Sequence, residues 1–429
     1  MAHFTRRKFM KVAGGTAAVG LAGVSPSLAL AGQAHVVVIG GGYAGGVAAK
    51  YIRMLSGGKV KVTLVEKDKY YYSCPLSNWV IAGFRDIEAQ KWSWAKAADA
   101  HGYSVVHDEA VGIDAKAKTV KLRGGSTLNY DRLIVAPGVG FKKNIEGYDT
   151  KAMVKMPHAW KAGLQTTLLA KQMEAMPDGG TAIVVPPENP FRCPPGPYER
   201  VSLMAWYIKR YKPKSKVLVL DPKDKFSKFG LFTGGWKELY GYGTDNSIIE
   251  WVAAGQGGKV TAVDADNMTV MTDMDEFKGD VVSVIPNNTA GAIAHSAGLT
   301  NGGDWCSVNK QTFESTSHPG VHVIGDSSIA AKMPKSGYAA NSQAKVVADA
   351  VVQMLAGKEP GTGSYVNTCY SMLSPDYGIS VAAVYKLKGD TISKVGGGLS
   401  PGKASAAYRK VEADNNESWY QSIMADTFT

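Results

Sequence analysis

A glycine-rich turn near the N-terminus has the spacing of a dinucleotide-binding site. Gly40, Gly42 and Gly45 follow the aliphatic run 36–39 at G-x-G-x-x-G spacing, and a helix-forming run comes directly after them. In such a turn the first glycine allows a tight bend, the second lets the backbone approach a pyrophosphate, and the third lets helix and strand pack closely. A second aliphatic run ends in Glu66, where a carboxylate would accept a hydrogen bond from a ribose hydroxyl. The predicted contacts are Gly40, Gly42, Tyr43, Ala44, Gly45, Glu66 and Lys67.

Four cysteines, at positions 74, 193, 306 and 369, are the residues best suited to redox chemistry. None has C-x-x-C spacing, so the sequence has no zinc ribbon, thioredoxin motif or c-type haem attachment site, and no metal site is expected. In an exported protein, Cys193 and Cys369 would by default form a structural disulfide. The alternative is a redox-active disulfide beside the bound dinucleotide. A buried free thiol is the simplest interpretation of Cys74 and Cys306.

A second motif, late in the chain, completes the nucleotide site. Residues 321–326 read as a strand that ends in Gly325 and Asp326, whose carboxylate would bind the ribityl or phosphate region. A helix is predicted to begin at Gly337, Tyr338 and Ala339, with its N-terminal amides toward the flavin pyrimidine ring. Residues 128–138 resemble the strand and turn that close the first FAD segment in flavoproteins with two dinucleotide-binding domains, although that family usually has threonine where this chain has Pro137. These motifs predict that the dinucleotide is FAD.

The segment between the two FAD motifs repeats the strand–helix–strand layout but lacks the glycine turn that binds phosphate. Strands are predicted at 181–185 and 216–220, with an amphipathic helix at 199–211 between them. The connecting turn, 186–197, is rich in proline, which fixes φ and removes backbone donors, so the turn cannot cradle a pyrophosphate. The electron donor is therefore predicted not to be NAD(P)H.

These elements predict an α/β fold with two Rossmann-like dinucleotide-binding domains, as in disulfide reductase-like flavoproteins. The FAD-binding domain is split between residues 32–146 and 288–360, and the second domain spans 147–287. Residues 361–429 are expected to cap the flavin or to meet a partner.

Residues 1–31 have the features of a twin-arginine export signal. Arg6 and Arg7 precede a Gly/Ala-rich apolar run, and cleavage is predicted after Ala31. A Sec signal and a membrane anchor are the alternatives. The prediction is a periplasmic protein exported in its folded state, and no other segment has the 18 uninterrupted apolar residues of a membrane span.

The charge of the chain is mildly basic. Its 48 basic and 37 acidic residues give a net charge of +11, which falls to +7 without the four basic residues of the leader. The charge is spread along the chain, which argues against nucleic-acid binding and leaves room for an acidic partner or an anionic substrate.

Longer motifs around three of the cysteines resemble the flavoprotein subunit of flavocytochrome c sulfide dehydrogenase. They are YSCPLSN at 72–78, FRCPPGPYER at 191–200 and YVNTCYS at 365–371, and the similarity runs from the export signal to the tail at 417–420. The resemblance implies that Cys74 is joined through sulfur to the 8α-methyl of FAD. It also implies that Cys193 and Cys369 form a disulfide beside the isoalloxazine, with Glu199 near the flavin. The implied partner is a small c-type cytochrome that carries the haem c, which this chain has no motif to bind.

The implied reaction is the oxidation of hydrogen sulfide to sulfane sulfur or polysulfide. Hydrosulfide would attack one sulfur of the disulfide, leaving a persulfide on one cysteine and a thiolate on the other. We expect Cys193 to be attacked and Cys369 to face the flavin, which would pass the electrons to the cytochrome. Glu199 would move protons or tune the charge of the site; alternatively, it is only a carboxylate favoured by a helix N-terminus.

Three other functions remain open at this point. A sulfide:quinone oxidoreductase shares the fold and a cysteine pair, but it should have an amphipathic, membrane-binding C-terminal stretch. The chain could also be a flavin-binding subunit without catalysis. A type-II NADH dehydrogenase is the third alternative, and the proline-rich turn argues against it.

Overall fold

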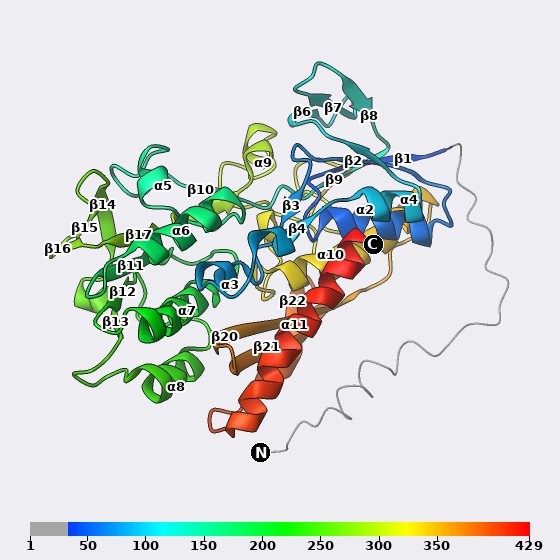
Figure 1. The fold of residues 1–429 in the computed structure, drawn as a ribbon. Coiled ribbons are helices and arrows are strands. Elements are labelled where there is room, and N and C mark those ends of the chain that lie inside the picture. Colours follow the sequence, from blue (N-terminus) through cyan, green and yellow to red (C-terminus); the bar gives the residue numbers. More distant parts are fainter. Residues whose placement is uncertain (1–32) are drawn as a thin grey trace.

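The computed structural model describes residues 33–429 (Figure 1). The predicted export signal therefore lies outside the described residues. Among those residues, no helix is long and apolar enough to cross a membrane.

The FAD-type half is built on a parallel sheet of five strands in the order β19-β9-β1-β2-β5. Its central strand, β1, is fully buried from Val36 to Val38, as expected for a parallel strand covered on both faces. Helix α2 (Gly45–Leu55) and helix α10 (Gly337–Leu355) pack against each other beside the sheet. The strands are β1 (His35–Ile39), β2 (Lys61–Val65), β5 (Ser104–Val106), β9 (Arg132–Val135) and β19 (Val321–Val323).

The second half repeats this design with a parallel sheet in the order β13-β12-β11-β17. Its strands are β11 (Thr181–Val185), β12 (Lys216–Leu220), β13 (Ile249–Val252) and β17 (Val281–Val284). Its principal helices are α6 (Leu164–Ala175), α7 (Gly196–Tyr211) and α8 (Phe229–Tyr240). The two parallel sheets confirm the predicted α/β fold with two Rossmann-like units, whereas the exact domain limits stay predictions.

The two halves are joined by an antiparallel pair of short strands. Strand β10 (Val139–Phe141) leaves the first half and pairs with β18 (Asn288–Ala290), which leads back into it. Because the outgoing and returning chains lie side by side, the site between the halves is held by a paired connection.

Smaller elements decorate both halves. Antiparallel three-stranded sheets lie at the rims, and short helices fill the loops. These elements are β6 (Ala110–Asp114), β7 (Thr119–Leu122), β8 (Thr127–Asn129), β14 (Val260–Asp264), β15 (Thr269–Thr272), β16 (Glu276–Lys278), β3 (Tyr71–Tyr72), β4 (Lys91–Trp92), α3 (Ser77–Ile81), α4 (Ala95–His101), α5 (Ala152–Lys155) and α9 (Ala292–Ser296).

The C-terminal region is an antiparallel sheet followed by a long helix. Strands β20 (Ser364–Ser374), β21 (Tyr377–Lys388) and β22 (Thr391–Leu399) form the sheet, and α11 (Ala406–Phe428) runs from it back to α2 (Figure 1). Phe428 packs between Tyr71 and Trp92, with ring centroids 5.2 and 5.9 Å away. Lys50 of α2 donates a hydrogen bond to the carbonyl of Thr429 at 2.9 Å. The helix is therefore fixed to the FAD-type half at its far end.

Candidate active site

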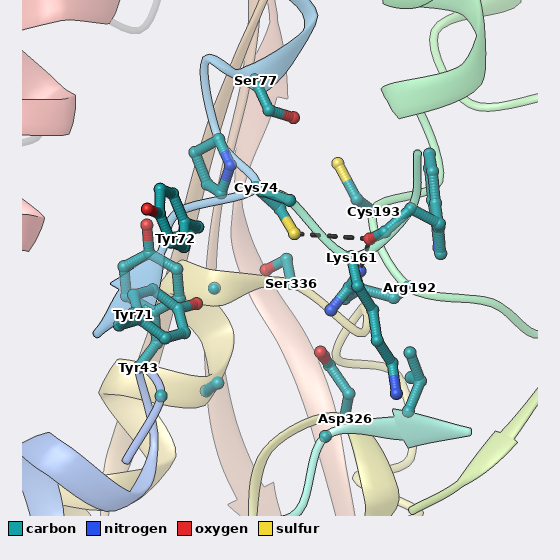
Figure 2. Close-up of a pocket in the computed structure, with 18 of the residues that line it drawn as sticks. Tyr43, Tyr71, Tyr72, Cys74, Ser77, Lys161, Arg192, Cys193, Asp326 and Ser336 are labelled. Atoms are coloured by element: carbon teal, nitrogen blue, oxygen red, sulfur yellow. Dashed lines mark hydrogen bonds between the residues drawn. The ribbon is translucent and has the colours of Figure 1, made fainter. Parts of the chain in front are cut away.

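A cavity of about 780 Å³ brings together the FAD-type half, the second half and the C-terminal region. All of the predicted site residues line it except Gly45 and Ala339, each of which is next in sequence to a lining residue. Figure 2 shows part of this lining, with Cys74, Cys193, Lys161, Arg192 and Asp326 around one open space. The positions that sequence analysis assigned to a cofactor and to sulfur chemistry thus share one pocket.

The glycine turn has the geometry that its spacing predicts. Gly40 has φ +92°, and a Cβ there would lie 2.4 Å from the carbonyl oxygen of Ala136. A Cβ at Gly45 would lie 1.8 Å from the carbonyl oxygen of Gly40, so only glycine lets α2 approach the strand. At Gly42, by contrast, the atom nearest to such a Cβ is a Tyr71 ring carbon at 3.6 Å, which is an ordinary contact distance, so a Cβ would fit there.

Glu66 supports this turn from the end of β2. One carboxylate oxygen accepts a hydrogen bond from the backbone N–H of Gly41 at 2.7 Å, and the other accepts one from the N–H of Asp68 at 3.1 Å. The Nε1 of Trp94 donates to the carbonyl of Gly41 at 2.8 Å. Glu66 lines the cavity as predicted, and it also fixes the loop that would carry a pyrophosphate.

Asp326 offers a direct test of whether a flavin dinucleotide fits. Its carboxyl group is buried in the cavity wall, and its Oδ1 has no hydrogen-bond partner among the described residues. Burial raises its pKa, against the opposing charges of Arg192 and Lys335. A buried oxygen without a partner is costly unless a ligand supplies a donor, and the hydroxyls of a ribityl chain are such donors. The residues present therefore fit FAD.

Cys74 lies in a loop between β3 and α3 whose backbone is held by hydrogen bonds. Its carbonyl accepts a hydrogen bond from Ser77 N–H at 3.0 Å, and the next residue's carbonyl accepts one from Gln90 at 2.9 Å. The half-buried thiol lines the cavity and donates to the carbonyl of Trp160 at 3.4 Å, the dashed line beside Cys74 in Figure 2. The loop thus fixes the backbone and leaves the sulfur reachable from the cavity. Covalent attachment of a flavin stays a prediction.

The structure brings Cys193 and Cys369 together from distant parts of the chain. Cys193 sits before α7 with φ +52°, held there because its N–H donates to the carbonyl of Lys335 at 2.7 Å. Cys369 lies on β20, and its sulfur is hydrogen-bonded to the Cys193 thiol. All four cysteines lie in the described part of the chain, and none is disulfide-bonded there. The redox-active disulfide therefore stays a prediction, whereas the proximity it requires is present.

The two thiols are not equivalent. The hydrogen bond from Cys193, together with the positive charge of Lys228, lowers the pKa of Cys369 to about 7, although burial acts in the opposite direction. The same hydrogen bond raises the pKa of Cys193 well above that of an ordinary thiol. When the pair is reduced, Cys369 is therefore the thiol that ionises first as the pH rises.

Glu199 lies in the first turn of α7 and connects three elements of the site. Its Oε1 accepts a hydrogen bond from the backbone N–H of Met372 on β20 at 2.9 Å, and its Oε2 accepts one from Asn78 Nδ2 at 2.9 Å. Burial raises the pKa of Glu199, and these hydrogen bonds oppose the rise. A buried carboxyl group with a raised pKa is suited to hold and release a proton.

Several residues of the site carried no recognised signal in the sequence. Arg200, 1% exposed, donates to the carbonyl oxygens of His158 and Ala159 at 2.7 Å each, and burial lowers its pKa to about 10. Asn416 and Trp419 of α11 line the cavity with side-chain nitrogens that have no partner among the described residues. Lys228 contacts the strand that carries Cys369. Arg200 is the last residue of the motif at 191–200 and could have been considered, but only the fold brings the others here.

In the second half, the acidic residue at the end of β12 is enclosed. Asp221 is fully buried and accepts hydrogen bonds from Tyr198 OH at 2.7 Å and Trp251 Nε1 at 3.0 Å. It also pairs with Lys223 at 2.7 Å. In a dinucleotide-binding unit, an acid in this position is available to a ribose. Here its partners are internal, which agrees with the predicted loss of NAD(P)H binding. Cys306, fully buried in the core, confirms the expectation of a buried thiol.

Three family models match successive parts of the chain. Residues 34–170 match pyridine nucleotide-disulphide oxidoreductase. Residues 166–286 match the central part of the sulfide dehydrogenase [flavocytochrome c] flavoprotein chain. Residues 362–428 match the flavin-binding part of flavocytochrome c sulphide dehydrogenase.

Individual relatives agree with these matches. The sulfide dehydrogenase [flavocytochrome c] flavoprotein chain of Chlorobaculum thiosulfatiphilum is 47% identical over 49 residues, which are 100% of that sequence and 11% of this chain. The sulfide-quinone reductase of Aquifex aeolicus is 24% identical over 341 residues, covering 74% of this chain and 76% of that one.

Solved structures share the fold. The sulfide:quinone oxidoreductase of Aquifex aeolicus superposes with a TM-score of 0.69 at 19% identity, covering 92% of each chain. An NAD-dependent persulfide reductase from A. fulgidus superposes with a TM-score of 0.60 at 19% identity, covering 91% of this chain and 77% of that chain.

Proposed function

Because the chain belongs to the family of flavocytochrome c sulfide dehydrogenase flavoprotein chains, we propose that it oxidises hydrogen sulfide and delivers the electrons to a c-type cytochrome subunit. Its family makes it a flavin-dependent oxidoreductase of the sulfide-oxidising kind. The observation that carries the proposal is the meeting of Cys193, Cys369 and Glu199 in the cavity that Asp326 and the glycine turn also line.

The chemical step uses the oxidised form of the cysteine pair. Hydrosulfide attacks the sulfur of Cys193, the S–S bond breaks, and Cys369 leaves with the electron pair as a thiolate. Cys193 then carries a persulfide, so the charge of the nucleophile has moved to Cys369. The positive charge of Lys228 lowers the pKa of Cys369, which supports this direction because a more acidic thiol is the better leaving group. Glu199 is the nearby carboxyl group that could accept the proton of the incoming sulfide.

The cofactor completes the cycle. FAD, when bound, accepts two electrons together and passes them on singly, which links a two-electron oxidation of sulfide to a one-electron haem acceptor. The glycine turn would hold its pyrophosphate, Asp326 its ribityl chain and the N-terminus of α10 its pyrimidine end. The outer sulfur of the persulfide would then leave as sulfane sulfur or polysulfide while the Cys193–Cys369 disulfide forms again, the two electrons of the cysteine pair going to FAD.

The central test replaces the cysteines one at a time. Cys193→Ser and Cys369→Ser should each abolish the bleaching of the flavin by sulfide, because neither serine can form the disulfide. Cys306→Ala, at a buried cysteine outside the site, is the matched control and should bleach normally. If either serine variant is reduced by sulfide at the normal rate, the disulfide mechanism is wrong. If sulfide fails to bleach the parent protein, a non-catalytic flavin-binding subunit is the better description.

We also propose that Cys74 holds FAD through an 8α thioether. The reachable thiol in a pinned loop supports this proposal. After acid precipitation, the flavin should stay with the pellet of the parent protein and appear in the supernatant of Cys74→Ala. Flavin released entirely from the parent protein would exclude the thioether.

A quinone acceptor is the second candidate, because sulfide-quinone reductase is a relative and shares the fold. A quinone enzyme of this kind should present an apolar C-terminal surface to the membrane. In this chain Tyr420, Ile423 and Phe428 of α11 are buried against the protein, and the large apolar side chains that the helix exposes are Tyr408 and Val411 near its start. Reduction of cytochrome c but not of a soluble quinone analogue, with haem-stained co-purification of a partner, would support the cytochrome assignment.

The site of action is also a proposal. The twin-arginine pattern at Arg6 and Arg7 supports export to the periplasm with FAD already bound. Replacing both arginines with lysine should keep the flavoprotein in the cytoplasmic fraction, and unchanged export would contradict the pathway.

A further inference from the structure

Lys228 is a buried cation directly behind the strand that carries Cys369. It caps the N-terminus of α8 with φ +61°, and only 6% of the residue is exposed. Its Nζ donates to the carbonyl of Cys369 at 3.2 Å and to Ser371 Oγ at 3.0 Å, both on β20. It also donates to the carbonyl of Ile379 on β21 at 3.4 Å. The ammonium group is thus held in place against the reactive strand.

All three of these acceptors are uncharged. A buried ammonium without an anionic partner is unfavourable, and such a charge is usually paired. Burial lowers the pKa of Lys228, and the charges of Cys369, Glu199, Cys193 and Glu412 oppose this effect by favouring its charged form. Both carboxylates have other partners: Glu199 is bonded by Met372 and Asn78, and Glu412 pairs with Arg409 and accepts from Ser400 Oγ. The two remaining groups are the cysteines.

We propose that Lys228 is a positioning residue whose ammonium group is the counter-charge for the Cys369 thiolate and so selects Cys193 as the sulfur that receives sulfide. This role rests on the disulfide chemistry of the proposed function. When hydrosulfide attacks Cys193, the S–S bond electrons go to Cys369, and the negative charge forms beside Lys228. Attack on Cys369 would instead place the thiolate on Cys193, where burial and the charge of Glu199 oppose it, although the charge of Arg192 favours it. The cation therefore favours attack of hydrosulfide on Cys193 over attack on Cys369.

The test must separate the effect of Lys228 on the Cys369 thiolate from the effects of the other groups near that sulfur. Cys193, hydrogen-bonded from the turn before α7, and Lys228, from α8, both stabilise the thiolate of Cys369, whereas Glu199 on α7 opposes it. Lys228→Met removes the cation, and Lys228→Arg keeps a cation. Lys228→Gln keeps two N–H donors without the charge, so it replaces the methionine variant if that one does not fold. Lys237→Met, at an exposed lysine of the same helix, is the matched control.

The first measurement needs no sulfide. The pair is reduced in the flavin-bound protein, alkylated with iodoacetamide from about pH 5 to about pH 10, and quantified at each cysteine by peptide mass spectrometry. We expect half-maximal alkylation of Cys369 near pH 7 in the parent, the arginine variant and the Lys237 control. Loss of the cation should raise this midpoint by about one pH unit, which lowers alkylation of Cys369 at pH 7 about fivefold to tenfold.

The second measurement locates the persulfide after one pulse of sulfide. It should lie on Cys193 in the parent and be divided between Cys193 and Cys369 when Lys228 is neutral. An unchanged alkylation midpoint and an unchanged persulfide position in a folded, flavin-bound neutral variant would overturn the role of Lys228. If no persulfide forms even in the parent, the proposed function fails instead, while the alkylation result still decides whether Lys228 stabilises the thiolate.

Discussion

Replacing Glu199 with glutamine changes one atom in a position where the hydrogen-bond directions are fixed. The glutamine oxygen can still accept from Met372 N–H, but its NH₂ group then faces Asn78 Nδ2, which is also a donor. Asn78 cannot turn its amide round to help, because its Oδ1 accepts from Arg200 Nε at 3.2 Å. One buried hydrogen bond is lost and two donors face each other, which we expect to lower the free energy of unfolding by about 1–3 kcal/mol.

The pH dependence of this effect has a definite sign. Between the ordinary carboxyl pKa of 4.5 and the raised pKa of Glu199, the folded chain keeps a proton that the unfolded chain has released. The parent protein therefore loses stability as the pH rises through this window. The glutamine variant does not titrate, so its deficit in stability should be greatest below the window and should shrink as the pH rises.

Urea unfolding midpoints of the flavin-bound parent and glutamine variant, measured from about pH 4 to about pH 8, would show whether the difference in stability shrinks as the pH rises. The same variant should lower the rate of flavin reduction by sulfide about 100-fold, the effect typical of losing a positioned acid–base group. Glu174→Gln, at an exposed carboxylate on α6, is the control and should change neither quantity. A deficit that grows with pH would refute the electrostatic reasoning, and an unchanged rate would remove Glu199 from the chemistry.

Three further predictions concern the cofactor pocket. Gly40→Ala should lower the free energy of unfolding by about 3 kcal/mol, because the alanine combines positive-φ strain with a clash between its Cβ and the backbone of Ala136. Gly42→Ala should change the stability of the apoprotein by less than about 0.5 kcal/mol but weaken FAD binding. Equal urea midpoints for the two apoproteins would contradict this account of the turn. Asp326→Asn should weaken flavin binding about tenfold in a Cys74→Ala background by fluorescence titration, since the unpartnered oxygen becomes a poorer acceptor; unchanged affinity would mean that Asp326 does not contact the ligand. Phe428→Ala should lower the free energy for local unfolding of α11 by about 3 kcal/mol, which would be measured as faster amide exchange confined to that helix. Exchange rates in α11 that change no more than those elsewhere would show that this ring does not anchor the helix.

The sequence was most informative where the chemistry depends on local geometry. The glycine turn, the strand ending before Glu66 and the start of α10 follow from backbone rules that act within a few residues, and the structure contains each of them. Proximity of Cys193 and Cys369 was expected from a resemblance, because 176 residues separate them and no local rule could pair them.

What the sequence did not reveal depends on contacts between distant elements. Lys228 reads as one of many surface lysines until α8 is packed against β20. Asn416 and Trp419 lie on a C-terminal helix for which the sequence predicted no site residue, yet both line the cavity. Their roles depend on which helix packs against which sheet, and that packing cannot be read from a single sequence.

The placement of α11 also bears on the order in which the cavity wall is synthesised. The other residues that line the cavity are translated before Asn416 and Trp419. In the folded chain, Phe428 and Lys50 hold α11 against the first half. A chain that ended before α11 would therefore contain the glycine turn, Cys74 and Asp326 but lack the part of the cavity wall that this helix supplies.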